Sequence, residues 1–176
     1  YQLPVALVGA YGIINQYFLK VLGGPAGGYL ADKKFESASR YLKWAFLALL
    51  PMMAVILAIP TGAGLVYAAM AGTLSFAFIV FSMRGVFWAP MSEVGIPSRI
   101  TGSAFGIGCL IGYAPGMFAY VIYGSILDRF PGEQGYTYVF GLMSALAVIG
   151  FLVASLLHRS VSKRGGAAVA EAALQA

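Results

Sequence analysis

Residues 134–157 read QGYTYVFGLMSALAVIGFLVASLL, a run of 24 residues without a charged side chain. About 20 apolar residues in a helix cross the ~30 Å hydrocarbon core of a bilayer, so this run is long enough for one crossing. Comparable uncharged runs cover residues 1–19, 65–83 and 100–127, and a shorter one covers 44–59. These runs lack the alternating polarity of membrane-barrel strands. The sequence therefore predicts an all-α, polytopic membrane protein with five transmembrane helices.

The composition excludes a soluble domain, because 60% of the 176 residues are hydrophobic and only 10% are charged. We expect a transmembrane helical bundle over residues 1–159, with helices at about 4–31, 41–59, 65–88, 100–127 and 136–157. A turn is expected at 60–64 and a disordered cytoplasmic tail at 160–176. The helix at 100–127 exceeds the thickness of the hydrocarbon core, which predicts a tilt, a kink at Pro115 or a protruding end. Because the chain begins at Tyr1 inside an apolar run, we also expect it to be a fragment.

The basic residues are distributed unevenly between the two ends of the predicted bundle. If successive helices alternate in direction, Arg129 lies on one side of the membrane. The other side receives Lys33, Lys34, Arg40, Lys43, Arg99, Arg159, Lys163 and Arg164. This bias marks the cytoplasmic side, so the C-terminus is predicted to be cytoplasmic and the membrane to be a bacterial inner membrane. The net charge of +5 then reflects topology, and a nucleic-acid partner is excluded.

The predicted helices differ in polarity. Those at 41–59 and 136–157 are apolar around most of their circumference, which is typical of helices that face lipid. The other three carry amide, hydroxyl and basic side chains that are costly against lipid, so they are expected to line a polar interior. Closely spaced glycines occur in the same helices and indicate either tight packing or surfaces that slide, and the sequence does not separate these.

Lys20 and Gln16 form the strongest candidate for a solute site. Lys20 precedes Asp32 by 12 residues, which places it roughly 18 Å from the cytoplasmic end of its helix, near the middle of the membrane. Gln16 lies one turn earlier on the same face. Lys20 either binds an anionic group of a solute or pairs with a carboxylate elsewhere, and both interpretations remain open.

Further candidates lie on the helices at 65–88 and 100–127. Arg84 precedes the interfacial Trp88 by one turn, so it either lines the inner end of a path or extends to the membrane surface. Tyr113 and Tyr120 follow helical spacing and either contact a solute or pack against neighbouring helices.

Several charged residues are expected in the cytoplasmic loops: Asp32, Lys33, Arg40, Glu93 and Arg99. These charges either form a network that holds one conformation of a transporter or simply set the membrane topology.

Three motifs resemble the major facilitator superfamily of transporters, over nearly the whole chain. Gly28-x-x-x-Asp32-Lys33, followed by Arg40, resembles the family's loop between helices eight and nine, although Lys34-Phe35 replaces its second glycine. Glu93-x-x-x-Pro97-x-Arg99-x-x-Gly102 resembles the turn before helix eleven, and residues 124–128 resemble the end of that helix.

Residues 23–28 and 84–93 make the chain similar to bacterial nitrate/nitrite and organic-anion porters, with Gly24 at the position of a nitrate-binding arginine. The resemblance implies that the chain is the C-terminal half, helices eight to twelve, of such a transporter and that an N-terminal half is its missing partner. It also implies gating roles for the cytoplasmic charges and for Gly28 and Pro115.

The expected function is secondary active transport of a small polar or anionic solute by alternating access, with the solute and the lipid bilayer as partners. A structural or channel-forming subunit of five helices is the alternative. An enzyme is not expected, because His158 is the only histidine and no intramembrane carboxylate pair occurs. The sequence indicates no cofactor, metal or catalytic residue.

Overall fold

The computed structural model describes residues 4–59 and 65–174, and among these it contains helices and turns without strands. Helices long and apolar enough to cross a membrane cover Val5–Lys34, Ala38–Ala58, Val66–Val86, Thr101–Arg129 and Glu133–Lys163. The predicted all-α class and the five crossings are confirmed. The turn expected at 60–64 lies outside the described residues.

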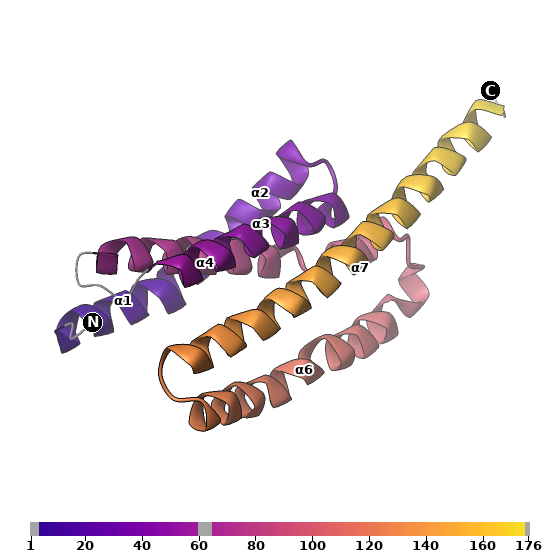
Figure 1. Cartoon of the computed structure of the whole chain (residues 1–176). Helices are drawn as coiled ribbons and strands as arrows, with labels where there is room; N and C mark the ends of the chain where they lie inside the picture. Colours follow the sequence, from indigo (N-terminus) through magenta and orange to yellow (C-terminus); the bar gives the residue numbers. More distant parts are fainter. Residues whose placement is uncertain (1–3, 60–64, 175–176) are drawn as a thin grey trace.

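The first crossing is one continuous helical segment made of four pieces (Figure 1). It contains α1 (Val5–Ile13), the π-helical turn η1 (Ile14–Phe18), α2 (Leu19–Tyr29) and a second π-helical turn, η2 (Leu30–Lys34). The chain then reverses at Glu36, which has a positive φ of 56°. Ser37 caps the next helix by accepting a hydrogen bond from the N–H of Arg40, as is usual for a serine at this position.

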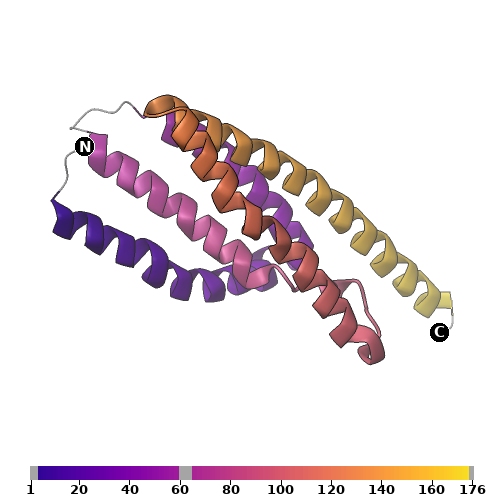
Figure 2. The same ribbon diagram turned by 90° about the horizontal axis from the view of Figure 1, so that it is seen from below.

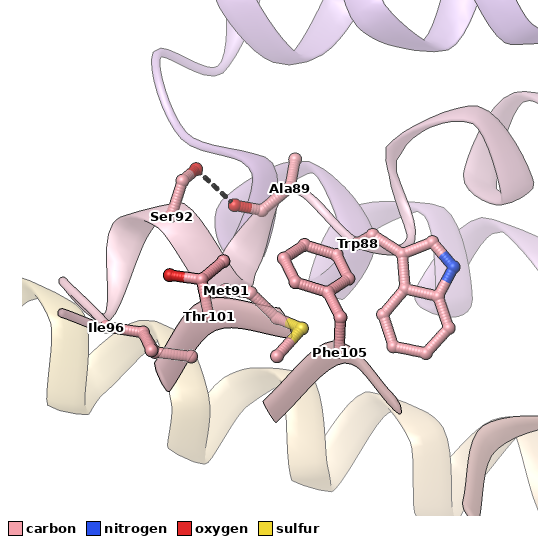
Figure 3. Close-up of a pocket in the computed structure, with 7 residues that line it drawn as sticks. All are labelled: Trp88, Ala89, Met91, Ser92, Ile96, Thr101 and Phe105. Atoms are coloured by element: carbon pink, nitrogen blue, oxygen red, sulfur yellow. Dashed lines mark hydrogen bonds between the residues drawn. The ribbon is translucent and has the colours of Figure 1, made fainter. Parts of the chain in front are cut away.

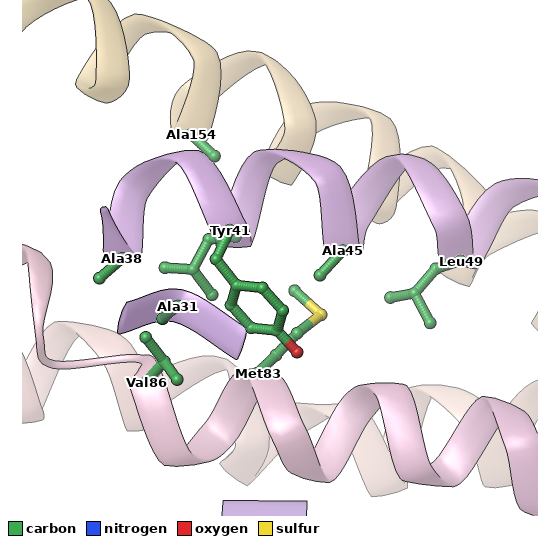
Figure 4. Close-up of a cluster of buried hydrophobic side chains, with 9 residues drawn as sticks. Ala31, Ala38, Tyr41, Ala45, Leu49, Met83, Val86 and Ala154 are labelled. Carbon is green, nitrogen blue, oxygen red and sulfur yellow. The ribbon is translucent and has the colours of Figure 1, made fainter. Parts of the chain in front are cut away.

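The second helix, α3 (Ala38–Ala58), packs between α4 (Val66–Val86) and α7 (Glu133–Leu174). Figure 4 shows the buried cluster that joins them, in which Tyr41 and Ala45 of α3 meet Met83 of α4 and Ala154 of α7. The Tyr41 hydroxyl also lies 2.5 Å from the buried Ser82 hydroxyl. This cluster fixes the three helices to one another at the end of the bundle that carries most of the basic residues, here called the basic end.

Glycines bring α2 and α4 into direct backbone contact. The two helices run side by side in the same direction (Figure 2). A Cβ atom on Gly27 would lie 2.1 Å from the carbonyl oxygen of Ser82, and one on Gly85 would lie 2.6 Å from the Cα of Gly24. Larger side chains have no room at this crossing, so these glycines serve close packing.

The connection from α4 to α6 contains the short helix α5 (Pro90–Glu93) and the 3-10 turn η4 (Ser98–Ile100). Next, α6 (Thr101–Arg129) continues through Pro115 without interruption and forms a hairpin with α7. Its 29 residues extend about 43 Å at the helical rise, more than one hydrocarbon core. The helix α7 continues to Leu174, into the segment 160–176 that we expected to be disordered. That segment is rich in alanine, which has the highest helix propensity.

Candidate functional site

The structure brings together two predicted site residues, Arg84 and Tyr113. Both line a pocket of about 280 Å³ between α4 and α6, together with Phe87, Trp88, Gly112 and Gly116. The ring centroids of Trp88 and Tyr113 are 6.2 Å apart. Arg84 is exposed at this pocket, and Tyr113 retains 55% of its surface.

Glycines of α6 explain why aromatic rings reach this pocket. A Cβ atom on Gly108 would lie 3.0 Å from the Trp88 ring, and one on Gly112 would lie 3.4 Å from the Phe87 ring. Since neither glycine has a side chain, the rings of Phe87 and Trp88, which directly follow α4, lie against the α6 backbone. These glycines were predicted only as part of a general pattern of closely spaced glycines, and Trp88 was predicted only to lie at the membrane interface.

Trp88 also lines a second hollow, of about 510 Å³. Figure 3 shows the second hollow, which is lined by the apolar side chains of Trp88, Met91 and Phe105 and by Thr101. Ser92 donates a hydrogen bond to the carbonyl oxygen of Ala89 there, at 2.7 Å. The described residues that line this hollow are uncharged, so of the two sites the Arg84 pocket is the one with a group that attracts an anion.

A guanidinium beside aromatic rings is suited to an anion with an apolar body. Arginine pairs with two oxygens of a carboxylate or phosphate at once. The rings of Trp88 and Tyr113 offer flat apolar surface, and the Tyr113 hydroxyl offers a hydrogen bond. The pocket volume of about 280 Å³ fits a small molecule rather than a polymer.

Lys20 and Gln16 lie elsewhere. They are exposed on α2 and η1, outside the lining of the Arg84 pocket. Beside them, the Oδ1 atom of Asn15 is buried in the π-helical turn η1 and has no hydrogen-bond partner among residues 4–59 and 65–174. One turn earlier, Tyr11 forms a hydrogen bond with Thr73 of α4. The π-helical turn was not predicted, because its extra residue per turn leaves no distinctive pattern in a single sequence.

At the basic end, Glu93 reaches across to the start of α3. Its carboxylate accepts hydrogen bonds from the backbone N–H groups of Ala38 and Ser39. Asp32 and Glu36 line the same hollow of about 330 Å³. A carboxylate at a helix N-terminus is favourable, because the first N–H groups lack partners within the helix.

The remaining predicted residues do not converge on one place. Lys33, Arg40 and Arg99 are exposed at the basic end. Tyr120 lines a separate hollow at the opposite end, with Asp128 and Arg129. A Cβ atom on Gly28 would meet open space. Among the described residues, no group of three histidine, cysteine, aspartate or glutamate side chains is placed to hold a metal ion.

Comparison with known proteins identifies relatives in Escherichia coli K12. Inner membrane protein YihN is 48% identical over 164 residues, which cover 93% of this chain and 39% of YihN. Inner membrane protein YqcE is 27% identical over 161 residues, which cover 87% of this chain and 36% of YqcE. The chain is a membrane protein homologous to both. The chain spans less than two fifths of the length of each relative, 39% of YihN and 36% of YqcE.

These comparisons correct the assignment based on motifs. No protein-family model matches the chain, and no solved structure matches it. The prediction that it is the C-terminal half of a major facilitator superfamily transporter was wrong, because the homology over 93% of the chain is to YihN. Short motifs of glycine and charged residues at helix ends are common in membrane helices, since they satisfy packing and topology in many of them.

Proposed function

We propose that the protein moves a small polar or anionic solute across the inner membrane by alternating access. The observation that supports this most directly is the pocket between α4 and α6, which places Arg84 beside Trp88 and Tyr113. In this proposal the guanidinium of Arg84 binds the anionic group, and the rings hold the rest of the solute. The names of YihN and YqcE describe membrane location and leave the solute open.

The cost of charge in a membrane favours a transport role. Lys20 and Arg84 both lie within segments that qualify as crossings, on exposed faces of α2 and α4. Such cations are rare in membrane helices unless they face a polar cavity or a partner. We propose that Lys20 and Gln16 face the same aqueous path as Arg84, at a level closer to the middle of the membrane.

The packing suggests which element moves. Backbone contact and the buried cluster join α2, α3, α4 and α7. By contrast, α6 has no buried residue and contacts α7 and the Trp88 region. We propose that α6 tilts against α4, which changes the volume of the Arg84 pocket. The basic end is then the cytoplasmic end, where the Glu93 contact to α3 closes one conformation.

Counterflow in proteoliposomes tests this proposal. The full-length gene product would be screened with nitrate, phosphate, and small mono- and dicarboxylates, each inside and outside the vesicle. A transporter exchanges a labelled anion faster when the same anion is on the other side. Arg84→Gln should abolish this exchange, Arg84→Lys should retain part of it, and Arg129→Gln at the opposite end should leave it unchanged.

Two outcomes would contradict the proposal. Flux that does not saturate with concentration and shows no acceleration by counterflow would indicate a channel. Equal exchange by the parent protein and Arg84→Gln would remove the pocket from the mechanism.

A further inference from the structure

Exposed side chains of α3 and α7 lie beside the line where the two helices meet. The surface that they form, here called the α3–α7 groove, includes Leu47 and Leu152 and ends in basic residues that the proposed transport does not use. Antiparallel register is fixed by two contacts: Ser144 donates a hydrogen bond to Met53 Sδ at 3.2 Å, and a Cβ atom on Gly150 would lie 2.5 Å from the ring of Phe46. From the first pair to the second, the residue number falls on α3, from 53 to 46, and rises on α7, from 144 to 150. Continued toward the basic end, this register sets Ser155 level with Leu42 and Arg159 level with Ala38.

Helical geometry then places Lys43 and Arg159 on the same side of the groove. Tyr41 points from α3 toward α4, where it meets Ser82. Residues advance about 100° each around a helix, so Lys43 lies on the side of α3 away from α4 and next to α7. On α7, Ala154 faces α3 (Figure 4). Arg159 lies about 140° further around α7 than Ala154. Because α3 and α7 are antiparallel, this rotation places Arg159 on the same outer side of the two helices as Lys43.

Each helix carries an apolar stripe that continues from its basic residue. On α3 the stripe has spacing i, i+4, i+7, i+11 and contains Lys43, Leu47, Leu50 and Ala54. On α7 the matching stripe contains Val148, Leu152, Ser155 and Arg159. Leu47 is 37% exposed, Val148 42% and Leu152 54%, so the middle of the groove offers apolar surface. The groove is thus basic at one end and apolar along its length.

The aromatic residue beside Lys43 fits a membrane boundary. The Lys43 Nζ lies 5.8 Å from the centroid of the Trp44 ring. Tryptophan is enriched at the level of lipid headgroups, and Trp44 is 48% exposed. Lys43 and Arg159 therefore lie where a phospholipid carries its phosphate.

We propose that this groove binds an anionic phospholipid, independently of the transport proposed above. Lys43 and Arg159 contact the phosphate, and an acyl chain lies along Leu47, Val148 and Leu152. An anionic lipid is favoured over a zwitterionic one because the exposed Arg40, three residues before Lys43 on α3, adds a third cation. The carboxylates of this end, Asp32, Glu36 and Glu93, line a hollow at the N-terminus of α3, together with residues of the connection after α4.

Lipid-dependent stabilisation tests the proposal. The full-length protein in detergent would be titrated with phosphatidylglycerol, phosphatidylcholine or inorganic phosphate while its thermal unfolding is recorded. Phosphatidylglycerol should raise the Tm in a saturable manner, and the other two additives should not. Each cation near a membrane surface contributes enough to change affinity about fivefold, so Lys43→Gln with Arg159→Gln should weaken the apparent affinity about 25-fold.

Two control variants make this test specific. Arg129→Gln removes a cation from the opposite end and should keep the parental affinity, and Lys43→Arg keeps the charge and should do the same. Because each variant is compared with its own unfolding in phosphatidylcholine, a general loss of stability does not imitate a loss of binding. Parental affinity in the double variant would overturn the site. An equal Tm rise with phosphatidylcholine, or with inorganic phosphate alone, would overturn the choice of an anionic lipid.

Discussion

The carboxylate of Glu93 accepts a hydrogen bond from the backbone N–H of Ser39 at 3.2 Å, although 54 positions separate the two residues. The contact joins the connection between α4 and α6 to the first turn of α3. It satisfies helix N–H groups that would otherwise lack partners, so it stabilises both segments at once. In the proposed mechanism it is also a contact that opens when α6 moves.

Removing this helix cap should destabilise the protein. We expect Glu93→Ala to lower the free energy of unfolding by about 1–2 kcal/mol, the usual value of a lost helix cap. Unfolding by SDS, followed by circular dichroism, measures this. Asp32→Asn is the matched control, because Asp32 lines the same hollow but accepts no hydrogen bond from the α3 N-terminus. Equal losses in the two variants would show that the charge of the hollow matters rather than the cap.

The contact between α2 and α4 should not accept a methyl group at Gly27. A Cβ atom there would lie 2.1 Å from the Ser82 carbonyl oxygen, which is backbone and has little freedom to move. Gly27→Ala should therefore cost about 1–3 kcal/mol, as overpacked sites do. Gly28→Ala is the control, since a Cβ atom at Gly28 meets nothing within 4 Å. The same SDS titration compares the two, and equal stability would contradict the close crossing.

The hydrogen bond between Tyr41 and Ser82 should contribute a modest coupling energy. The two hydroxyls are 2.5 Å apart in the buried cluster, and Ser82 also donates to the carbonyl oxygen of Ile79. Bonds between membrane helices average about 0.6 kcal/mol, because alternative partners exist in the unfolded state. A double-mutant cycle with Tyr41→Phe and Ser82→Ala should give a value near this. Purely additive effects would show that the bond contributes nothing.

Filling the Arg84 pocket should stop transport without removing any charge. Gly112 lines this pocket opposite Phe87 and Trp88. Gly112→Leu places a side chain in a space of about 280 Å³, and we expect solute exchange to fall at least about tenfold as the bound geometry is lost. Gly106→Leu, one to two turns earlier on α6 with open space around it, should exchange solute at the parental rate. Equal exchange by both variants would contradict a solute site at this pocket.

Part of the candidate site was predictable from single residues. Arg84 and Tyr113 stand out because a cation and a hydroxyl in apolar helices are costly against lipid. Their shared pocket was not predictable, since it depends on how Gly108 and Gly112 let Phe87 and Trp88 approach α6. Glu93 was predicted either to join a network of charges or to help set the membrane topology, and the structure shows its carboxylate bound to backbone N–H groups. Backbone partners carry no sequence signal.

The sequence by itself determined that this chain is an all-α membrane protein with five crossings. The reason is physical: a hydrocarbon core requires about 20 apolar residues per crossing, with every backbone group hydrogen-bonded inside its own helix. Tertiary structure alone decided which residues meet, such as Glu93 with Ser39 and Arg84 with Tyr113. Those pairings depend on the rotation and register of each helix against its neighbours, and side-chain shape across the interface sets both.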